Sequence, residues 1–339
     1  MNSKKMITMI MALTMVFVMV ACSDGETGDT AATTQEVVET VDVEESVEEK
    51  EEESVEELTS YIVTDALGRE VEIPANPERV IALTSAASEA LRILEIPQVG
   101  KVSAYKIDSE ILDLPSIGST SSLNMETIYE LQPDLIIAQA RTHTALEESL
   151  ELSGAAVYYF DSDLSGEISI VDLIPYLGNV LGKEEIGNDY KEYITELAAE
   201  RAATVADSTD IKTALIIQEG DTISAAINAS GYGSMLLLLE IENIIPDDLP
   251  GSDSGSFVTY DMEEITAADP DLIFVILSAT DEEERAAAIE SYKENPLWSG
   301  LSAVQNGTFI ALPANVNPNL STTVDMLELT TQAILATAE

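Results

Sequence analysis

Hydrophobic and polar positions alternate along residues 59–339 in the manner of an α/β protein. Short apolar runs, such as Val80–Thr84, suit strands that are buried on both faces. Between them lie stretches with apolar residues three or four positions apart, which predict helices. Because strand and helix alternate, the pattern predicts mostly parallel sheets covered on both sides. Just before Val80, YIVTDALGREVEI predicts two short strands that turn at Leu67–Gly68.

The individual elements follow from the same pattern. The expected strands are Val80–Thr84, Val99–Val102, Leu135–Ala138, Val157–Phe160, Thr213–Gln218, Leu272–Val275 and Phe309–Pro313. The expected helices are Ser85–Ile96, one that begins near Asn124, Ala145–Gly154, Ile168–Val205 with a break near Gly182, Gly231–Ile244, Glu282–Pro296 and Thr322–Ala338. The segment ARTHT, after the third of these strands, is expected to be a loop.

One passage occurs twice. METIYELQPDLIIA at Met125–Ala138 and MEEITAADPDLIFV at Met262–Val275 share Met-Glu, an isoleucine and Pro-Asp-Leu-Ile at the same offsets. Each predicts a helix that ends before proline and is followed by a buried strand, which is half of an α/β crossover unit. A common αβ connection would explain the break but not the matching Glu126 and Glu263. The repeat therefore predicts two similar lobes.

A long helix is expected between the lobes. Residues from Glu184 to Ala206 contain no proline and place apolar residues at helical spacing over about 35 Å. Such a helix suits a rigid connection between two lobes. The sequence thus predicts a first lobe at 59–183, a connecting helix at 184–207 and a second lobe at 208–339.

The first 22 residues have the proportions of a signal peptide rather than a membrane span. Lys4 and Lys5 precede an apolar stretch that stops at Ala21–Cys22. A small residue before a lone cysteine resembles a lipobox, the bacterial lipoprotein signal, although Met19 stands where leucine is usual. We expect Cys22 to be lipidated; a free thiol beside an uncleaved anchor is the alternative. As the only cysteine, Cys22 also excludes disulfides within the chain.

Two regions of the chain carry a large excess of acidic residues. Residues 23–58 hold 15 acidic residues against one lysine, so we expect a disordered acidic tether between membrane and folded body. Residues 59–339 hold 48 of the 63 acidic and 12 of the 15 basic residues, a net charge of −36. A body this acidic does not bind nucleic acid through phosphate contacts. The same acidity also suits a saline habitat.

The sequence lacks the residues and motifs that many enzyme active sites use. The sequence has one histidine and one cysteine, and neither a phosphate-binding loop nor a nucleophile elbow occurs. GYGSM is rich in glycine but lacks dinucleotide-binding spacing. No enzyme activity, resident cofactor or metal site is therefore expected.

Five passages, in order, resemble the substrate-binding proteins of ABC importers for iron–siderophore complexes, haem and cobalamin. They are YIVTDALGREVEIPANPERVIALTSAASEALRIL, LPSIGSTSSLNMETIYELQPDLIIA, SGYGSMLLLLEIENII, YDMEEITAADPDLIFV and NPLWSGLSAVQNGTFIALP. The resemblance covers about residues 60–335. It implies two Rossmann-like lobes joined by one long helix, a ligand cleft between them and a small hinge motion.

The resemblance also implies how the protein meets its partner. In this family, one glutamate of each lobe contacts arginines of a two-fold permease, and the matching positions are Glu126 and Glu263. Favourable placement at a helix start is the alternative explanation for each. Glu264 and Glu89 are the nearest competing positions.

Ligand contacts are expected beyond the strand ends. Arg141 lies where siderophore receptors of this family carry an arginine that meets an anionic chelate, and a guanidinium pairs with catecholate or carboxylate oxygens. His143 is a candidate for iron or haem contact; a solvent-exposed loop histidine is the alternative. Ser85 and Ser88 follow the first strand, where the family lines its cleft.

Five tyrosines offer stacking or phenolate ligation, although tyrosines in such elements are more often packed. They are Tyr105, Tyr158, Tyr159, Tyr232 and Tyr260, of which Tyr105, Tyr232 and Tyr260 are the candidate ligand contacts. The order of the second-lobe passages is similar to that of the haem-receptor lipoproteins of Gram-positive bacteria. Their axial positions correspond to about Ser121 and to Ser278 or Ala279, which do not bind haem iron strongly.

The expected function is a monomeric, lipid-anchored receptor that captures an iron chelate of the siderophore type and delivers it to an ABC permease. Haem or cobalamin in the same role is the alternative within the class. A surface sensor or adhesion module on the same fold is an alternative of another class, because fold alone does not dictate function. A hydrolase would need a nucleophile–base pair in the cleft.

Overall fold

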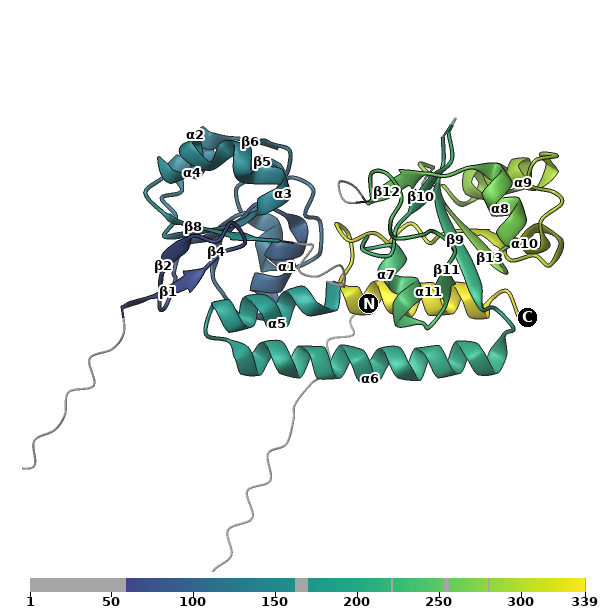
Figure 1. Cartoon of the computed structure of the whole chain (residues 1–339), viewed down its shortest axis with the longest axis horizontal. Helices are drawn as coiled ribbons and strands as arrows, with labels where there is room; N and C mark the ends of the chain where they lie inside the picture. The colour runs from purple at the N-terminus through teal and green to yellow at the C-terminus, as the bar shows by residue number, and fades with distance from the viewer. Residues whose placement is uncertain (1–58, 162–169, 221, 253–255, 280, 339) are drawn as a thin grey trace, which may run out of the picture. The chain divides into compact units, whose positions relative to one another are not determined.

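The computed structural model describes residues 59–161, 170–220, 222–252, 256–279 and 281–338 (Figure 1). The predicted signal, the tether and the predicted lipidation site Cys22 lie outside the described residues. Within them, two α/β lobes are each built on their own sheet, and most strand pairs of these two sheets are parallel. The α/β class with two lobes is therefore confirmed.

The first lobe has a four-stranded parallel sheet. Its order is β4 (Gln98–Gly100), β3 (Val80–Ala82), β7 (Leu135–Gln139) and β8 (Ala156–Phe160). Val80 and Ala82 pack into one core and Ile81 into another, so the sheet is buried on both faces. This explains why its strands are continuously apolar. β1 (Ser60–Thr64) and β2 (Glu70–Pro74) form the expected hairpin, whose turn uses the positive φ of Gly68.

The helices of the first lobe differ from expectation in two places. They are α1 (Ser85–Ile93), α2 (Met125–Glu130), α3 (Ala140–His143), α4 (Glu147–Glu151) and α5 (Ile170–Val180), with 3₁₀ turns at Glu110–Asp113 and Thr144–Leu146 and a small hairpin of β5 (Gly118–Ser119) and β6 (Ser122–Leu123). The expected loop ARTHT is wrong, because its first four residues form α3. The helix expected to reach Gly154 ends at Glu151, and Gly154 closes the turn with φ +79°.

The second lobe has a six-stranded mixed sheet. Its path is β12 (Phe257–Thr259), β10 (Ser224–Ala226), β9 (Thr213–Gln218), β13 (Leu272–Ile276) and β14 (Phe309–Ala311), with β11 (Glu242–Asn243) also beside β9. β9, β11, β13 and β14 are parallel, whereas β10 runs antiparallel to β9 and β12. The antiparallel wing was not expected, since its strands are only three residues long and leave little periodicity to detect.

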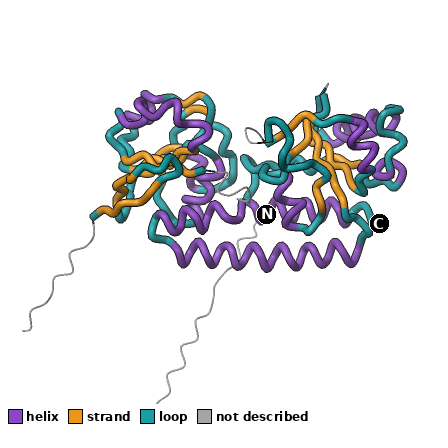
Figure 2. Tube along the Cα trace, viewed as in Figure 1, coloured by secondary structure: helices purple, strands orange, loops and turns teal. Residues whose placement is uncertain are grey.

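Five helices accompany this sheet among the described residues. They are α7 (Gly233–Leu238), α8 (Met262–Ala268), α9 (Glu282–Glu294), α10 (Ser302–Gln305) and α11 (Thr323–Leu335). The helix expected over 231–244 ends at Leu238, because Glu240 adopts a left-handed conformation and the chain continues as β11. Apolar side chains of β9 and β13 alternate between two cores, so this sheet is also covered on both faces. Figure 2 shows the helices and loops that surround its strands.

Helix α6 (Glu184–Ser208) connects the lobes. Its 25 residues span about 37 Å. Ile186 packs into the first lobe and Ile194 into the second, while Tyr190 contacts the cores of both. α6 lies along α5 and α11 (Figure 1). The division of the chain at 59–183, 184–207 and 208–339 stays a prediction.

A glycine permits the close packing of α5 against α6. A Cβ atom at Gly187 would lie 2.8 Å from the Cα of Pro175 and 3.3 Å from the carbonyl oxygen of Ile174. Both neighbours are backbone atoms and cannot rotate away. The connecting helix is therefore held tightly to the first lobe at this point.

Candidate ligand cleft and docking surfaces

Two serines stand at the start of α1, directly beyond the carboxyl end of β3. Thr84 caps the helix by accepting a hydrogen bond from the Ala87 N–H. Ser85 is 8% exposed and Ser88 is fully buried, and neither hydroxyl has a hydrogen-bond partner among the described residues. A buried hydroxyl without a partner is costly, so these positions suit contact with a ligand or water. Ser85 and Ser88 stay predicted ligand contacts.

The second lobe contains a comparable hydroxyl that the sequence analysis missed. Ser234 lies in the first turn of α7, is buried, and has no partner for its hydroxyl within the described chain. The glycine-rich string around it was noticed only as a helix start. An unpaired polar atom cannot be inferred from one sequence, because it depends on what surrounds the side chain.

Tyr105 is enclosed within the first lobe. Its side chain is fully buried in the first-lobe core, and its hydroxyl donates a 2.8 Å hydrogen bond to the Glu89 carboxylate. Burial raises the pKa of Tyr105 far above 10.0, so phenolate ligation at this position is disfavoured. The expectation of a direct contact through Tyr105 is therefore corrected to a structural role.

Glu89 is also structural. It is 8% exposed and accepts hydrogen bonds of 2.8 and 2.6 Å from the Arg92 guanidinium, which raises the pKa of Arg92. A carboxylate that is buried and paired in this way is not available to a permease. This removes Glu89 as a competing docking position.

His143 is enclosed rather than exposed in a loop. Its exposed fraction is 0%, its Nδ1 accepts the backbone N–H of Gln139, and its Nε2 lies 3.0 Å from the Thr120 carbonyl oxygen. Burial lowers the pKa of His143, which favours the neutral ring. Both ring nitrogens are thus engaged with backbone groups, and the imidazole is not presented to iron or haem. The alternative of a solvent-exposed histidine is wrong for the same reason.

Arg141 lies two residues earlier on α3 and is exposed. It follows the carboxyl end of β7, the edge at which ligands of parallel sheets bind. Arg141 stays a predicted ligand contact.

The other tyrosines are partly or fully packed. Tyr158 and Tyr159 are buried in the two first-lobe cores. Tyr232 packs 5.5 Å from the ring of Phe257, and Tyr260 packs against the second core of the second lobe. Burial raises the pKa of both Tyr232 and Tyr260. Tyr232 and Tyr260 stay predicted ligand contacts. Because a raised pKa keeps the hydroxyl protonated, stacking or hydrogen bonding is favoured over phenolate ligation.

The lobes touch through a segment that precedes α11. The backbone N–H of Lys106 donates to the Asn319 carbonyl oxygen at 2.7 Å, and the side chains of Tyr190 and Thr323 are hydrogen-bonded. A cavity of about 20 Å³ lies beside these contacts. It is lined by Ala86, Glu89, Ile107, Leu173, Ile174, Pro318, Ser321 and Thr323. It is too small for a chelate, so ligand binding at this depth requires the lobes to move apart.

The positions that correspond to haem ligands hold no strong donor. Ser121 is exposed between β5 and β6, and the backbone N–H of Ser278 donates to the Glu219 carboxylate. Among the residues that the structure describes, no group of three or more His, Cys, Asp or Glu is placed to hold a metal ion.

Glu126 and Glu263 are both exposed in the first turns of their helices. α2 begins after Asn124, whose side chain accepts the Thr127 N–H, and α8 begins after Asp261. Glu264 is exposed as well, so it is not excluded by burial. The carboxylates of Glu126 and Glu263 are thus accessible, and their docking role stays a prediction.

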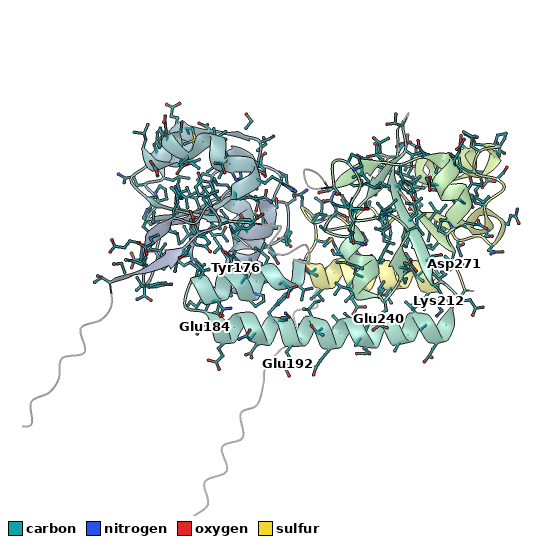
Figure 3. All side chains as sticks on the ribbon, in the orientation of Figure 1. Tyr176, Glu184, Glu192, Lys212, Glu240 and Asp271 are labelled. Atoms are coloured by element: carbon teal, nitrogen blue, oxygen red, sulfur yellow. The ribbon has the colours of Figure 1, made fainter. Side chains whose placement is uncertain are left out.

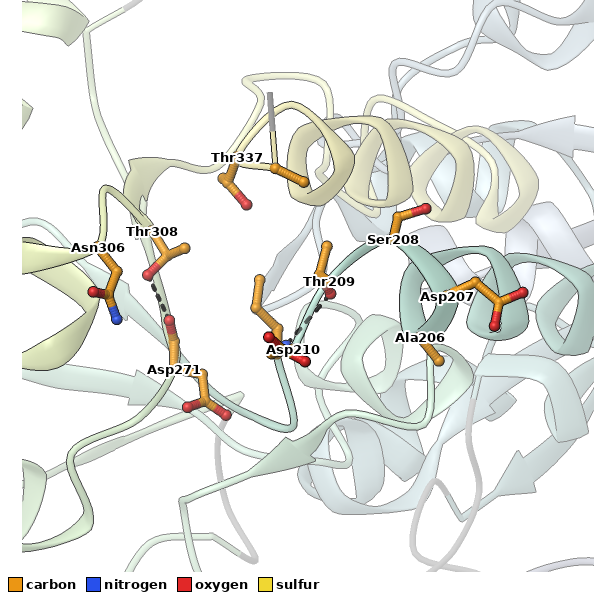
Figure 4. A pocket seen from close by; sticks show the side chains of 11 residues that line it. Ala206, Asp207, Ser208, Thr209, Asp210, Asp271, Asn306, Thr308 and Thr337 are labelled. Carbon is orange, nitrogen blue, oxygen red and sulfur yellow. Dashed lines mark hydrogen bonds between the residues drawn. The ribbon is translucent and has the colours of Figure 1, made fainter.

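A larger hollow of about 500 Å³ lies elsewhere, at the end of α6 and the amino ends of second-lobe strands (Figure 4). Asp207, Asp210 and Asp271 line it together with threonines. The Thr308 hydroxyl donates a hydrogen bond to the backbone carbonyl oxygen of Asp271. The hollow lies at the amino ends of the strands, whereas ligands of α/β lobes bind at the carboxyl ends. Its size therefore does not make it the binding site.

Two α/β lobes on one connecting helix, each with buried hydroxyls that have no partner among the described residues, suit a protein that binds a ligand between its lobes. Residues 80–316 match the family model described as periplasmic binding protein, and the chain belongs to this family. It is therefore an extracytoplasmic binding protein. None of the described helices has the length and apolarity to cross a membrane.

Three similar proteins narrow the comparison. The chain is 25% identical over 258 residues to the Fe(3+)-citrate-binding protein YfmC of Bacillus subtilis, covering 73% of this chain and 76% of that protein. It is 27% identical over 266 residues to the probable siderophore-binding lipoprotein YfiY of the same organism, covering 72% and 78%. The FhuD protein from S. pseudintermedius has a TM-score of 0.64 at 20% identity, covering 82% and 99%, and shares the fold.

Proposed function

We propose that this protein is a receptor that captures an iron chelate and delivers it to an ABC permease. The observation that carries the proposal is its similarity, over nearly three quarters of the chain, to relatives named for ferric citrate and siderophore binding. Affinity comes from contacts in the cleft, and no bond is made or broken. Ser85, Ser88 and Arg141 of the first lobe, with Tyr232 and Tyr260 of the second, are the proposed contacts.

Delivery requires recognition of the permease. Glu126 and Glu263 are exposed at equivalent places in the repeated passages, one in each lobe. Two carboxylates on separate lobes fix both position and orientation on a two-fold partner that offers arginines. The receptor binds the permease as a monomer, since the two lobes of one chain contact the two halves of the two-fold partner.

A lipid anchor keeps the receptor near the permease. Cys22 follows Ala21 and an apolar stretch, and at least one relative is named a lipoprotein. Lipidation of Cys22 would leave residues 23–58 as the tether. Mass spectrometry of the amino-terminal peptide from the host protein should find a diacylglycerol-modified Cys22.

Native mass spectrometry of the protein purified from its host tests the function directly. The expected result is a bound mass that contains iron and a small organic chelator. Absorbance separates haem from this expectation, because a coordinated haem shifts its Soret band during a titration. A bound haem would favour the alternative ligand, whereas a receptor that carries and binds no iron compound contradicts the proposal.

A further inference from the structure

We infer that the cleft takes a ferric chelate that is neutral or positively charged, such as a hydroxamate complex, and discriminates against polyanionic chelates. The inference rests on the proposed function and names the class of chelate. It follows from where the positive charges of the folded body lie.

The described part of the chain contains 12 basic residues, and most of them already interact with other groups of the protein. Five form ion pairs with carboxylates of the protein itself. These are Arg69, Arg92, Lys191, Arg201 and Lys293. A cation that is paired within the fold has less charge to offer a ligand.

Two further arginines are bound to backbone carbonyl groups. Arg79 donates to the carbonyl oxygens of Gln132 and Leu131. Arg285 is 7% exposed and donates to those of Ala279 and Leu312, beyond the carboxyl ends of β13 and β14. The guanidinium of Arg285 therefore holds two loops of the second lobe in place through their carbonyl oxygens.

Three lysines are also poorly placed. Lys101 is buried, and its ammonium lies 3.4 Å from the Tyr105 carbonyl oxygen. Lys183 directly precedes the connecting helix α6. Lys212 precedes β9 and therefore lies at the edge of the sheet opposite to the ligand edge. Figure 3 shows Lys212 beside Asp271, away from the first lobe.

Near the ligand edge of the first lobe lie two more cations, Lys106 and Arg141. The backbone of Lys106 makes the contact to Asn319 between the lobes, and Arg141 follows β7. Acids occupy comparable places: Asp161 follows β8, and Glu219 follows β9. Glu89 lines the cavity between the lobes.

Polyanions are costly to remove from water without several cationic partners. A body with net charge −36 adds repulsion to that cost. By contrast, the hydroxyls of Ser85, Ser88 and Ser234 are uncharged, buried and without partners in the described chain. Such groups complement the carbonyl and hydroxamate oxygens of an uncharged chelate.

Equilibrium dialysis of the full-length protein in detergent tests the inference with three ferric chelates. The probes are ferrioxamine B, which is singly positive, ferrichrome, which is uncharged, and ferric enterobactin, which is triply negative. We expect the two hydroxamates to bind at least about tenfold more tightly, and the gap to narrow in high salt.

A charge variant gives a second readout. Glu219→Gln removes a negative charge at the ligand edge but keeps an oxygen that can accept the Ser278 N–H. It should strengthen ferric enterobactin binding by about threefold and leave ferrichrome binding unchanged. Glu192→Gln makes the same change on the exposed face of α6 and should alter neither (Figure 3).

The outcomes separate the two proposals. Equal or tighter binding of ferric enterobactin overturns the inference and leaves the receptor function standing. An equal effect of Glu219→Gln on all three probes overturns it too. Failure to bind any ferric chelate contradicts the proposed function itself.

Discussion

The two lobes use nearly the same passage to build the same local structure. In both, a helix ends at a residue with positive φ, Gln132 at 43° and Asp269 at 42°, just before proline. The proline excludes helix from that residue, and the left-handed turn directs the chain into the strand. The passage thus specifies a complete helix–turn–strand unit.

The aspartate after the proline makes the same kind of hydrogen bonds in both lobes. Asp134 accepts the backbone N–H groups of Glu78 and Arg79, which lead into β3. Asp271 accepts those of Lys212 and Thr213, which lead into β9. In each case one carboxylate joins the start of two neighbouring parallel strands.

Beyond this unit the lobes differ. The first sheet is wholly parallel, whereas the second adds an antiparallel wing through β10 and β12. The fold therefore requires the proline and the aspartate, which have structural partners, but it does not require Glu126 and Glu263, which are exposed. Their repetition is consistent with the proposed docking, in which both lobes contact one partner.

The largest expected effect comes from removing both exposed glutamates. Uptake of a labelled iron chelate by cells that carry Glu126→Ala with Glu263→Ala should fall by about a hundredfold, because charged pairs at an interface contribute strongly to complex formation. Binding of the chelate to the purified variant should not change. Each single variant should show an intermediate loss of similar size.

Glu130→Ala with Glu264→Ala is the matched control, since both residues are exposed on the same two helices. It should support normal uptake. Full uptake by the first double variant would refute the docking role, and a loss confined to the control would move it to the neighbouring residues.

An intermediate effect is expected from the paired aspartates. Asp134→Ala and Asp271→Ala should each lower the free energy of unfolding by about 2 kcal/mol, because backbone N–H groups lose a charged acceptor. Urea denaturation followed by circular dichroism measures both. Asn at either position keeps an acceptor oxygen and should cost less. A large effect in one lobe only would show that the two units are not equivalent.

The smallest expected effect distinguishes the lobes by pH. Burial lowers the folded-state pKa of His143 below its ordinary value of 6.5, so the folded state binds this proton less readily than the unfolded chain. The contribution to stability is complete above pH 6.5 and is lost as the pH falls from there toward the folded pKa. His143→Gln should show a shallower loss of stability between pH 7.5 and 5.5 in thermal unfolding.

An unchanged pH slope in the variant would mean that carboxylates alone cause the loss. The second lobe has no histidine and should not contribute this component. Hydrogen exchange in strands β7 and β13, measured across the same pH range, locates the effect in one lobe or the other.

Most of the main elements could be predicted from the sequence, because continuous apolar runs and helical spacing are strong local signals. Val80–Ala82, Leu135–Gln139, Thr213–Gln218 and α6 are examples. The elements that were missed or misplaced are short. Helix α3 has four residues and β10 has three, so neither contains enough positions to show a period.

The candidate site was harder to predict. Tyr105 and His143 have side chains that suit a ligand, but both are buried and hydrogen-bonded within the first lobe. Ser234 was missed although it is buried without a partner. These differences arise because hydrogen bonding and exposure depend on residues far away in the chain.

The sequence by itself determined the α/β class, the repeated helix–turn–strand unit and the excess of negative charge, since each depends on residue type and on neighbours along the chain. The tertiary structure decided which polar side chains are enclosed, which cations are already paired and which glutamates are exposed. Burial and pairing are set by contacts between distant segments, such as Glu89 with Tyr105, and local sequence does not encode them.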